Sequence, residues 1–281
     1  MLRAPSNASA RLSGSSFSSA PQPLAVFLGL GSFIVYSTWA AFQNAHYTYG
    51  PYLSPFYSPE LFGDAARLGL TAGASTPNNV VGEVVERILA LRQAVHHLNK
   101  HGVPGAFVEC GVYKGGSAIA AIVATREGQF GIDRDVWLYD TFEGMTAPTA
   151  VDVTFDGVPA QVDMDLNLNT MVCPLDEVKG AIDAVTGYQH IHYVKGRVEE
   201  TIPRFVPDEI ALLRLDTDWY ESTKHELEHL YPLLAPGGII LIDDYGHWEG
   251  ARRAVDDYWH EHMLDTHLAR IDYTGRIGVK L

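Results

Sequence analysis

Hydrophobic positions change their spacing repeatedly along the chain from Val80 to the C-terminus. Short apolar runs typical of strands alternate with stretches whose apolar residues recur at helical spacing. This alternation predicts an α/β fold, a Rossmann-like, doubly wound, mostly parallel sheet. We expect strands at Ala106–Cys110, Val136–Tyr139, His190–Val194, Ile210–Leu215, Gly238–Ile242, Leu268–Tyr273 and Arg276–Leu281. The last two flank the tight turn Thr274-Gly275, which predicts an antiparallel pair at the C-terminal end of the chain.

The sequence divides the chain into three parts. We expect residues 1–45 to form a targeting, anchor or disordered extension, residues 46–80 a linker with a lid-like segment, and residues 81–281 the α/β domain. The stretch Val80–Leu98 has apolar residues at helical spacing, which predicts a helix leading into that domain.

The N-terminal extension contains an apolar run, 24–42, without a charged residue. Its length suits a membrane-spanning helix, and Arg3 and Arg11 before it favour a cytoplasmic N-terminus. A targeting peptide and a buried or oligomer-forming helix are the other interpretations. We expect a cytoplasmic protein, with a membrane-anchored or organelle-targeted protein as the alternative.

The overall charge narrows the choice of partner. A net charge of −14 and a pI near 5.2 argue against nonspecific binding to nucleic acid or to an anionic membrane. The two cysteines, Cys110 and Cys173, imply neither a disulfide framework nor a thiolate zinc site. We expect a small-molecule partner, and leave open a homo-oligomer and membrane contact through 24–42.

Carboxylates follow two of the expected strands. Asp216 and Asp218 come after Ile210–Leu215, and Asp243 and Asp244 come after Ile239–Ile242, with a helical pattern between the two runs. A strand–helix–strand unit of this length forms a right-handed parallel crossover, so the acids meet at the edge where such sheets bind ligands. If the first strand continues past its acids, Asp216 and Asp218 share a face. Oxygen ligands of this kind favour a hard divalent ion such as Mg²⁺, although solvated loop residues or helix caps are the plainer explanation for any one of them.

A glycine-rich turn, Glu109 to Ser117, follows the first expected strand and precedes a helix. Glycines let the backbone approach a ligand, and the helix N-terminus offers unpaired N–H groups. The spacing is not that of a dinucleotide site, and Glu109 would repel a pyrophosphate. S-adenosylmethionine, with an amino group and a carboxylate at one end, suits the turn better. Asp140, at the end of the second strand, can accept hydrogen bonds from ribose hydroxyls.

The connection from Met145 to Gln189 is longer than an ordinary loop. Its first half holds Asp152, Asp156, Asp163 and Asp165. A long insertion on the ligand edge of such a sheet is commonly a lid or a substrate loop.

At this point the sequence resembles the macrocin O-methyltransferase (TylF-type) family from Val81 to the C-terminus. The matching motifs are VECGVYKGGS at 108–117, YDTFEGM at 139–145, PLDEVKGAI at 174–182, KGRVEETIP at 195–203, LRLDTDWYEST at 213–223 and PGGIILIDDYGHWEGARRAVDDY at 236–258. The extension 1–45 has no counterpart in this resemblance.

The resemblance implies a class I methyltransferase domain over 81–281 that uses S-adenosylmethionine and Mg²⁺ to methylate a sugar hydroxyl. The cofactor residues that it implies are Glu109, Gly111, Lys114, Gly115, Gly116, Ser117, Asp140, Gly196 and Arg197. It places the metal ligands on Asp216, Asp243 and Asp244 and the general base on Asp218. Tyr245 and His247, which follow the metal pair, are candidates for substrate contact, with a structural role for the loop histidine as the alternative.

The implied mechanism joins these parts. A sugar hydroxyl is about as weak an acid as water, so the ion would lower its pKa and Asp218 would take the proton. A catechol-type O-methyltransferase and a catalytically silent scaffold that binds the cofactor are the competing functions. Thr223 and Glu226 also have the spacing of a capping box, which would explain part of the motif by helix initiation alone.

Overall fold

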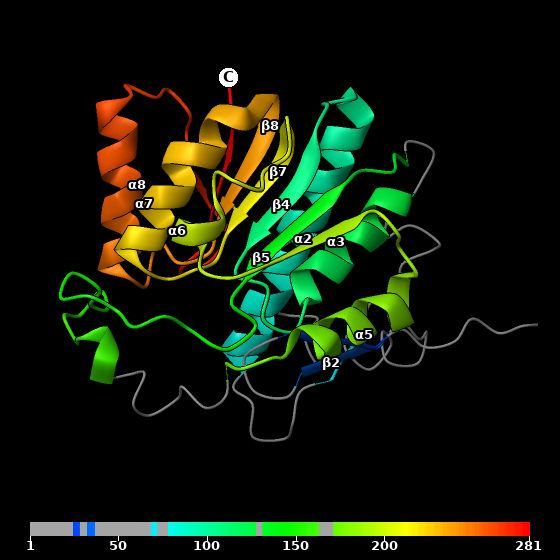
Figure 1. The fold of residues 1–281 in the computed structure, drawn as a ribbon, viewed down its shortest axis with the longest axis horizontal. Helices are drawn as coiled ribbons and strands as arrows, with labels where there is room; N and C mark the ends of the chain where they lie inside the picture. The colour runs from blue at the N-terminus through cyan, green and yellow to red at the C-terminus, as the bar shows by residue number, and fades with distance from the viewer. Residues whose placement is uncertain (1–24, 29–32, 37–68, 72–77, 128–130, 163–170) are drawn as a thin grey trace, which may run out of the picture.

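The computed structural model describes residues 25–28, 33–36, 69–71, 78–127, 131–162 and 171–281. Its main feature is a seven-stranded sheet with the order β6-β5-β4-β7-β8-β10-β9 (Figure 1). The strands are β4 (Ala106–Cys110), β5 (Val136–Asp140), β6 (Ile191–Lys195), β7 (Ile210–Leu215), β8 (Leu234–Ile242), β9 (Ala269–Arg270) and β10 (Arg276–Val279). β6, β5, β4, β7 and β8 are parallel neighbours, and β10 is antiparallel to both β8 and β9. The predicted fold, a mostly parallel α/β sheet with an antiparallel C-terminal pair, is confirmed.

Helices cover both faces of this sheet (Figure 1). The helices are α2 (Asn78–His101), α3 (Gly116–Arg126), α5 (Leu175–Thr186), α6 (Val198–Thr201), α7 (Tyr220–Leu230), the 3₁₀ turn η3 (Tyr231–Leu233) and α8 (Glu249–Glu261). Successive strand residues face opposite sides, so Phe107 packs with α2, α3 and α5 while Val108 packs with α7 and α8. Both faces of the central strands β4, β7 and β8 are therefore largely closed to water, which is why these strands read as continuous apolar runs.

The bounds of most strands agree with the prediction to within two residues, and β8 and β9 differ most. β8 begins at Leu234, before the Pro-Gly-Gly that suggests a turn, because Leu234 already pairs with Ile210 of β7. β9 is shorter than the predicted Leu268–Tyr273. The Asp272 carboxylate accepts hydrogen bonds from the N–H groups of Thr274 and Gly275, which starts the turn to β10 early.

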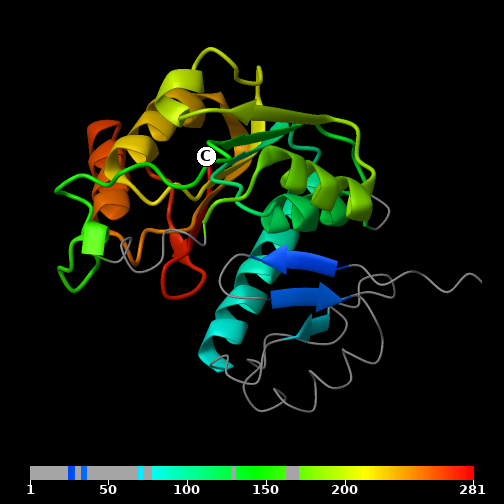
Figure 2. The ribbon, with the colours of Figure 1, turned by 60° about the horizontal axis from the view of Figure 1, so that its bottom comes forward.

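A second sheet, of three strands, lies outside the first, on the side of α3 and α5 (Figure 2). It consists of β1 (Ala25–Leu28), β2 (Phe33–Tyr36) and β3 (Gly69–Thr71), and its strands are antiparallel neighbours. β1 and β2 fall within the apolar run 24–42, and the rest of that run lies outside the described residues. Among the described residues, none of the helices has the length and apolar character needed to cross a membrane.

Candidate active site

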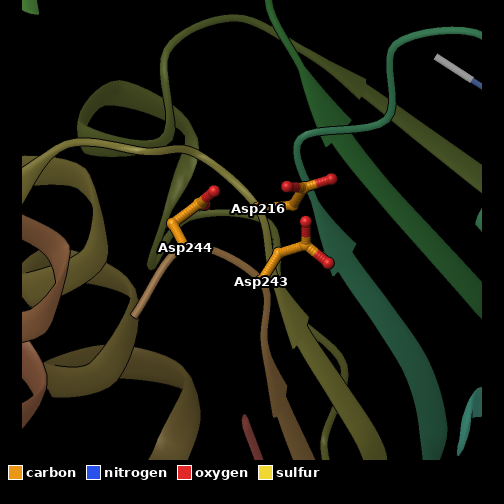
Figure 3. Close-up of side chains that lie close together, drawn as sticks. All are labelled: Asp216, Asp243 and Asp244. Carbon is orange, nitrogen blue, oxygen red and sulfur yellow. The ribbon is translucent and has the colours of Figure 1, made fainter. Parts of the chain in front are cut away.

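Three carboxylates meet where β7 and β8 end (Figure 3). Asp216 directly follows β7, and Asp243 and Asp244 directly follow β8. Hydrogen bonds of 2.9 Å from Asp216 N to Cys110 O and from Asp243 N to Leu215 O carry the sheet to this edge. One oxygen from each acid lies within 4.8 Å of the others. The structure therefore brings together the three residues predicted as metal ligands.

Two arginine side chains pair with part of this cluster. Arg214, inside β7, donates from Nη1 to Glu109 Oε1 at 2.8 Å and to Asp216 Oδ2 at 2.7 Å. Its Nη2 donates to Asp243 Oδ1 at 2.9 Å, and Arg87 of α2 donates to Asp243 Oδ2 at 2.8 Å. Burial alone would raise the pKa of Asp243, but attraction to Arg214 and Arg87 outweighs it and lowers the pKa below its ordinary value.

The remaining charge fits a divalent cation. Asp244 is buried, and burial followed by repulsion from Asp218 and Asp243 raises its pKa. The donors of the cluster are all carboxylate oxygens, the hard ligands that Mg²⁺ prefers. The two guanidiniums compensate only part of the repulsion between the carboxylates, and a cation among them would offset the rest. These residues therefore suit the ion that the resemblance implies.

Asp218 lies beside the cluster rather than on the face of Asp216. β7 ends at Leu215, and Asp218 has a left-handed backbone with φ of 66°, so the condition for a shared strand face is not met. Asp218 Oδ1 accepts a hydrogen bond of 2.7 Å from Trp248 Nε1, and its N–H donates to Asp244 Oδ2 at 3.2 Å. Burial, followed by repulsion from Asp216, raises the pKa of Asp218 to about 7. A carboxyl group poised near neutral pH suits proton transfer.

The glycine-rich turn after β4 touches the acid edge directly. Gly111 has φ of 83°, and a Cβ at this position would lie 1.9 Å from the carbonyl oxygen of Asp216. Only glycine therefore lets the two backbones pass. Gly115, with φ of 78°, precedes α3, whose first residues Gly116 and Ser117 line the cavity described below.

Asp140 holds this turn in shape. Its Oδ2 accepts hydrogen bonds from Val112 N at 2.7 Å and Tyr113 N at 2.9 Å, and its Oδ1 accepts one from Phe142 N at 2.7 Å. These contacts were not predicted from the sequence. Asp140 also lines the cavity, so a ligand can still reach it.

The other predicted cofactor residues divide into two groups. Lys114, Gly196 and Arg197 line the cavity, and Gly196 N donates to the Asp140 carbonyl at 3.0 Å. Glu109 and Gly115 are not part of its lining. The Glu109 carboxyl is buried against Arg214, and burial, opposed by that arginine, raises its pKa to about 7.

One cavity of about 1030 Å³ joins the two halves of the site. Gly111 and Asp140 line it on the side of the glycine turn, and the three clustered acids line it on the other. A cavity of this size accommodates a nucleoside-sized cofactor together with a second small molecule.

The two predicted substrate residues are placed differently. His247 lines the cavity, and its Nδ1 lies 3.1 Å from the hydroxyl of Tyr273. Tyr245 is not part of the lining, and its hydroxyl donates to Asp256 Oδ1 on α8 at 2.6 Å. The structure does not bring Tyr245 together with His247 at the cavity wall.

Sequence reasoning missed several residues of the site. Arg214 could have been suspected, because a charged residue inside an apolar strand needs a partner. Arg87 gave no such signal on the polar face of a helix. Trp219 and Trp248 also line the cavity, with their rings 5.1 Å apart in a T-shaped arrangement.

The capping-box prediction is wrong. α7 begins at Tyr220, so Thr223 lies inside the helix rather than at its N-cap. Glu226 is fully buried and accepts a hydrogen bond from Thr217 Oγ1, with distances of 3.0 and 3.2 Å to its two oxygens. It therefore fixes the segment between Asp216 and Asp218 instead of capping the helix.

Comparison with known proteins identifies relatives of this chain. A family model described as macrocin-O-methyltransferase (TylF) matches residues 69–277. A second, described as actinobacterial succinate dehydrogenase subunit SdhC, matches residues 21–99, which is less than half of the chain. The chain is 32% identical over 207 residues to a tetracenomycin-C derivative 4'-O-methyltransferase of Streptomyces olivaceus, covering 72% of this chain and 75% of the relative. It is 30% identical over 198 residues to the mycinamicin III 3''-O-methyltransferase of Micromonospora griseorubida, covering 68% and 74%.

A solved structure gives the same result for the fold. The O-methyltransferase NovP superposes with a TM-score of 0.61 at 29% identity, covering 70% of this chain and 80% of NovP. The fold and these relatives together define an O-methyltransferase of the Rossmann-like class, for which S-adenosylmethionine is the implied methyl donor. The chain belongs to the macrocin O-methyltransferase family.

Proposed function

We propose that this protein transfers the methyl group of S-adenosylmethionine to a hydroxyl of a sugar or glycosylated small molecule, with the help of Mg²⁺. The observation that carries the proposal is the cavity that the glycine turn and the acid cluster share, with Gly111 against the backbone of Asp216. The names of the relatives from Streptomyces olivaceus and Micromonospora griseorubida support a glycosylated acceptor.

On the cofactor side, the chain contributes a preformed turn. Gly111, Lys114, Gly116 and Ser117 would hold the methionine end, where the N-terminus of α3 favours a carboxylate. Asp140, Gly196 and Arg197 would lie along the nucleoside. Glu109 would not contact the cofactor. It would hold Arg214 in place, and Arg214 in turn positions the neighbouring acids.

On the acceptor side, Asp216, Asp243 and Asp244 would hold the ion, which supplies a positive charge that makes the acceptor hydroxyl a stronger acid. Asp218 would remove the proton from that hydroxyl. Trp248 holds Asp218 by its indole N–H, so the carboxyl group keeps its orientation while it gains the proton. His247 would contact the acceptor at the cavity wall. Alignment of the two substrates in this one cavity would supply much of the rate.

The test is methyl transfer to glycosides before and after exhaustive removal of divalent ions with EDTA. We expect activity to disappear and to return on addition of Mg²⁺, with S-adenosylmethionine still bound in the chelated protein. Full activity in EDTA would exclude the role of the ion. Transfer to a catechol but to no glycoside would favour the catechol-type function, and cofactor binding without transfer to any diol would favour a silent scaffold.

A further inference from the structure

The segment 149–160, in the long connection after β5, is fixed against the active site. The Asp152 carboxylate, which is buried, accepts hydrogen bonds from Thr149 N at 2.7 Å and from Tyr220 N, the first residue of α7, at 2.8 Å. Phe155 N donates to His247 O at 2.9 Å, and Thr154 forms a β-bridge with Trp248. These contacts hold the segment 149–160, called the wall below, beside the part of the cavity proposed to bind the acceptor.

An exposed aromatic ring stands on this wall. Phe155 is 59% exposed, although its backbone is held by His247. Its ring meets Tyr273 edge-on at 5.6 Å and His247 at 6.3 Å, and the rings of His247 and Tyr273 are 5.9 Å apart. Three elements distant in sequence thus place three rings together.

The three rings of Phe155, His247 and Tyr273 lie next to the cavity and not on a separate part of the surface. His247 and Tyr273 line the cavity together with Asp244, whereas Phe155 lies just outside its lining. Val151 and Val158, from the same wall, are also exposed, at 37% and 39%. The cavity is therefore lined by carboxylates where a hydroxyl would react, and aromatic and apolar side chains lie at its outer side.

We propose that Phe155, His247 and Tyr273 form a subsite for an apolar ring of the acceptor, the part of a glycoside beyond the sugar that is methylated. Aromatic side chains offer edges and faces that suit flat or apolar rings, and burying an exposed phenylalanine under such a ring is favourable. The subsite rests on the proposed function, because it would bind the other part of the same acceptor molecule.

The test compares the methyl glycoside and the 4-nitrophenyl glycoside of one deoxysugar. Affinity is measured by calorimetry with S-adenosylhomocysteine and Mg²⁺ present, and KM and kcat are measured with S-adenosylmethionine. The wild-type protein should bind the 4-nitrophenyl glycoside more tightly. F155A should weaken its binding about tenfold or more and reduce the preference over the methyl glycoside, while F155Y, which keeps the ring, should retain it.

Phe205 provides a matched control, because it is also exposed, at 51%, and its ring lies against Arg204 rather than against His247 and Tyr273. F205A should keep the wild-type preference. Equal affinity for the two glycosides, or an unchanged preference in F155A, would overturn the subsite even if methyl transfer occurs. A preference lost in F155A supports it even if neither glycoside is methylated, and in that case the proposed function alone fails.

Discussion

Arg87 and Asp243 form an ion pair that joins the helix ahead of the sheet to the acid edge. Nη1 of Arg87 lies 2.8 Å from Oδ2 of Asp243, although 156 positions separate the two residues in the sequence. The same guanidinium pairs through Nε with the buried Asp272 and donates from Nη2 to Thr274 Oγ1 at 2.7 Å. α2 is thereby tied to β8 and to the turn before β10.

Replacing Arg87 with methionine should lower the stability of the protein. The change leaves the charges of Asp243 and Asp272 without this partner, and removing one member of a buried pair costs about 3 to 5 kcal/mol. Because the Arg87 side chain is 26% exposed, we expect a smaller loss of about 2 to 3 kcal/mol, measured by urea unfolding at neutral pH. R252M on α8, where the side chain is 50% exposed, should change stability by less than about 1 kcal/mol. Equal effects of the two substitutions would contradict a structural role for the Arg87 pair.

Glu226 should make stability depend on pH. Burial, opposed by the hydrogen bond from Thr217, raises the pKa of this carboxyl well above its ordinary value. The folded protein then holds a proton that the unfolded chain releases above about pH 4.3, so stability is complete below that pH and falls as pH rises, by up to about 1.4 kcal/mol per unit. E226Q cannot ionise and should escape this fall, which makes it more stable than wild type at pH 7 but not at pH 4. Urea unfolding across this range measures the difference.

Glu228, on the same helix and largely exposed, supplies the control for that experiment. E228Q should follow the wild-type curve at every pH. If E226Q also runs parallel to wild type, Glu226 is ionised in the folded protein and its charge is compensated within the structure.

Asparagine substitutions should separate the clustered acids from Asp218. D216N and D243N each remove one of the proposed charged ligands, so Mg²⁺ affinity should fall and excess Mg²⁺ should restore part of the activity. D218N leaves the cluster intact but cannot take the proton. We expect turnover to fall roughly 10²–10⁴-fold with little change in the binding of Mg²⁺ or cofactor. Rescue of D218N by Mg²⁺ would instead make Asp218 a ligand.

Asp152 should stabilise α7 from outside the helix. The N-cap residue of α7, Trp219, makes no side-chain capping hydrogen bond, and Asp152 Oδ1 accepts from Tyr220 N in its place. D152A should cost about 1 to 2 kcal/mol of unfolding free energy, as loss of an N-cap does, while D183A on the exposed face of α5 should cost much less. A thermal melt of both variants distinguishes them, and matching melting temperatures would rule out the cap.

Removing residues 1–45 should leave a protein that binds S-adenosylmethionine, because the described residues that line the cavity begin at Val84. The deletion also removes β1 and β2, and β1 contacts α3 and α5. Calorimetric titration of the shortened chain measures cofactor affinity. A chain that cannot fold or bind would show that the first strands support the domain.

The features that follow from the parallel crossover could be predicted from the sequence. The contacts made by long side chains could not. Asp216, Asp243 and Asp244 follow apolar strands, so their meeting at one edge could be predicted from topology alone. Arg87 could not be assigned, since a long side chain on a helix can reach many partners. A shared face for Asp216 and Asp218 required β7 to continue past Leu215, and the end of a strand depends on local backbone conformation, which is left-handed at Asp218.

The contact between Gly111 and the backbone of Asp216 has a consequence for how acceptors can change. With no side chain between the two main chains, the distance between the glycine turn and the three clustered acids is set by backbone atoms directly after β4 and β7. Substitutions in the segment 149–160 would therefore reshape the outer part of the proposed acceptor site without altering that distance. A substitution of Gly111 would change this distance, and with it the alignment proposed for every acceptor.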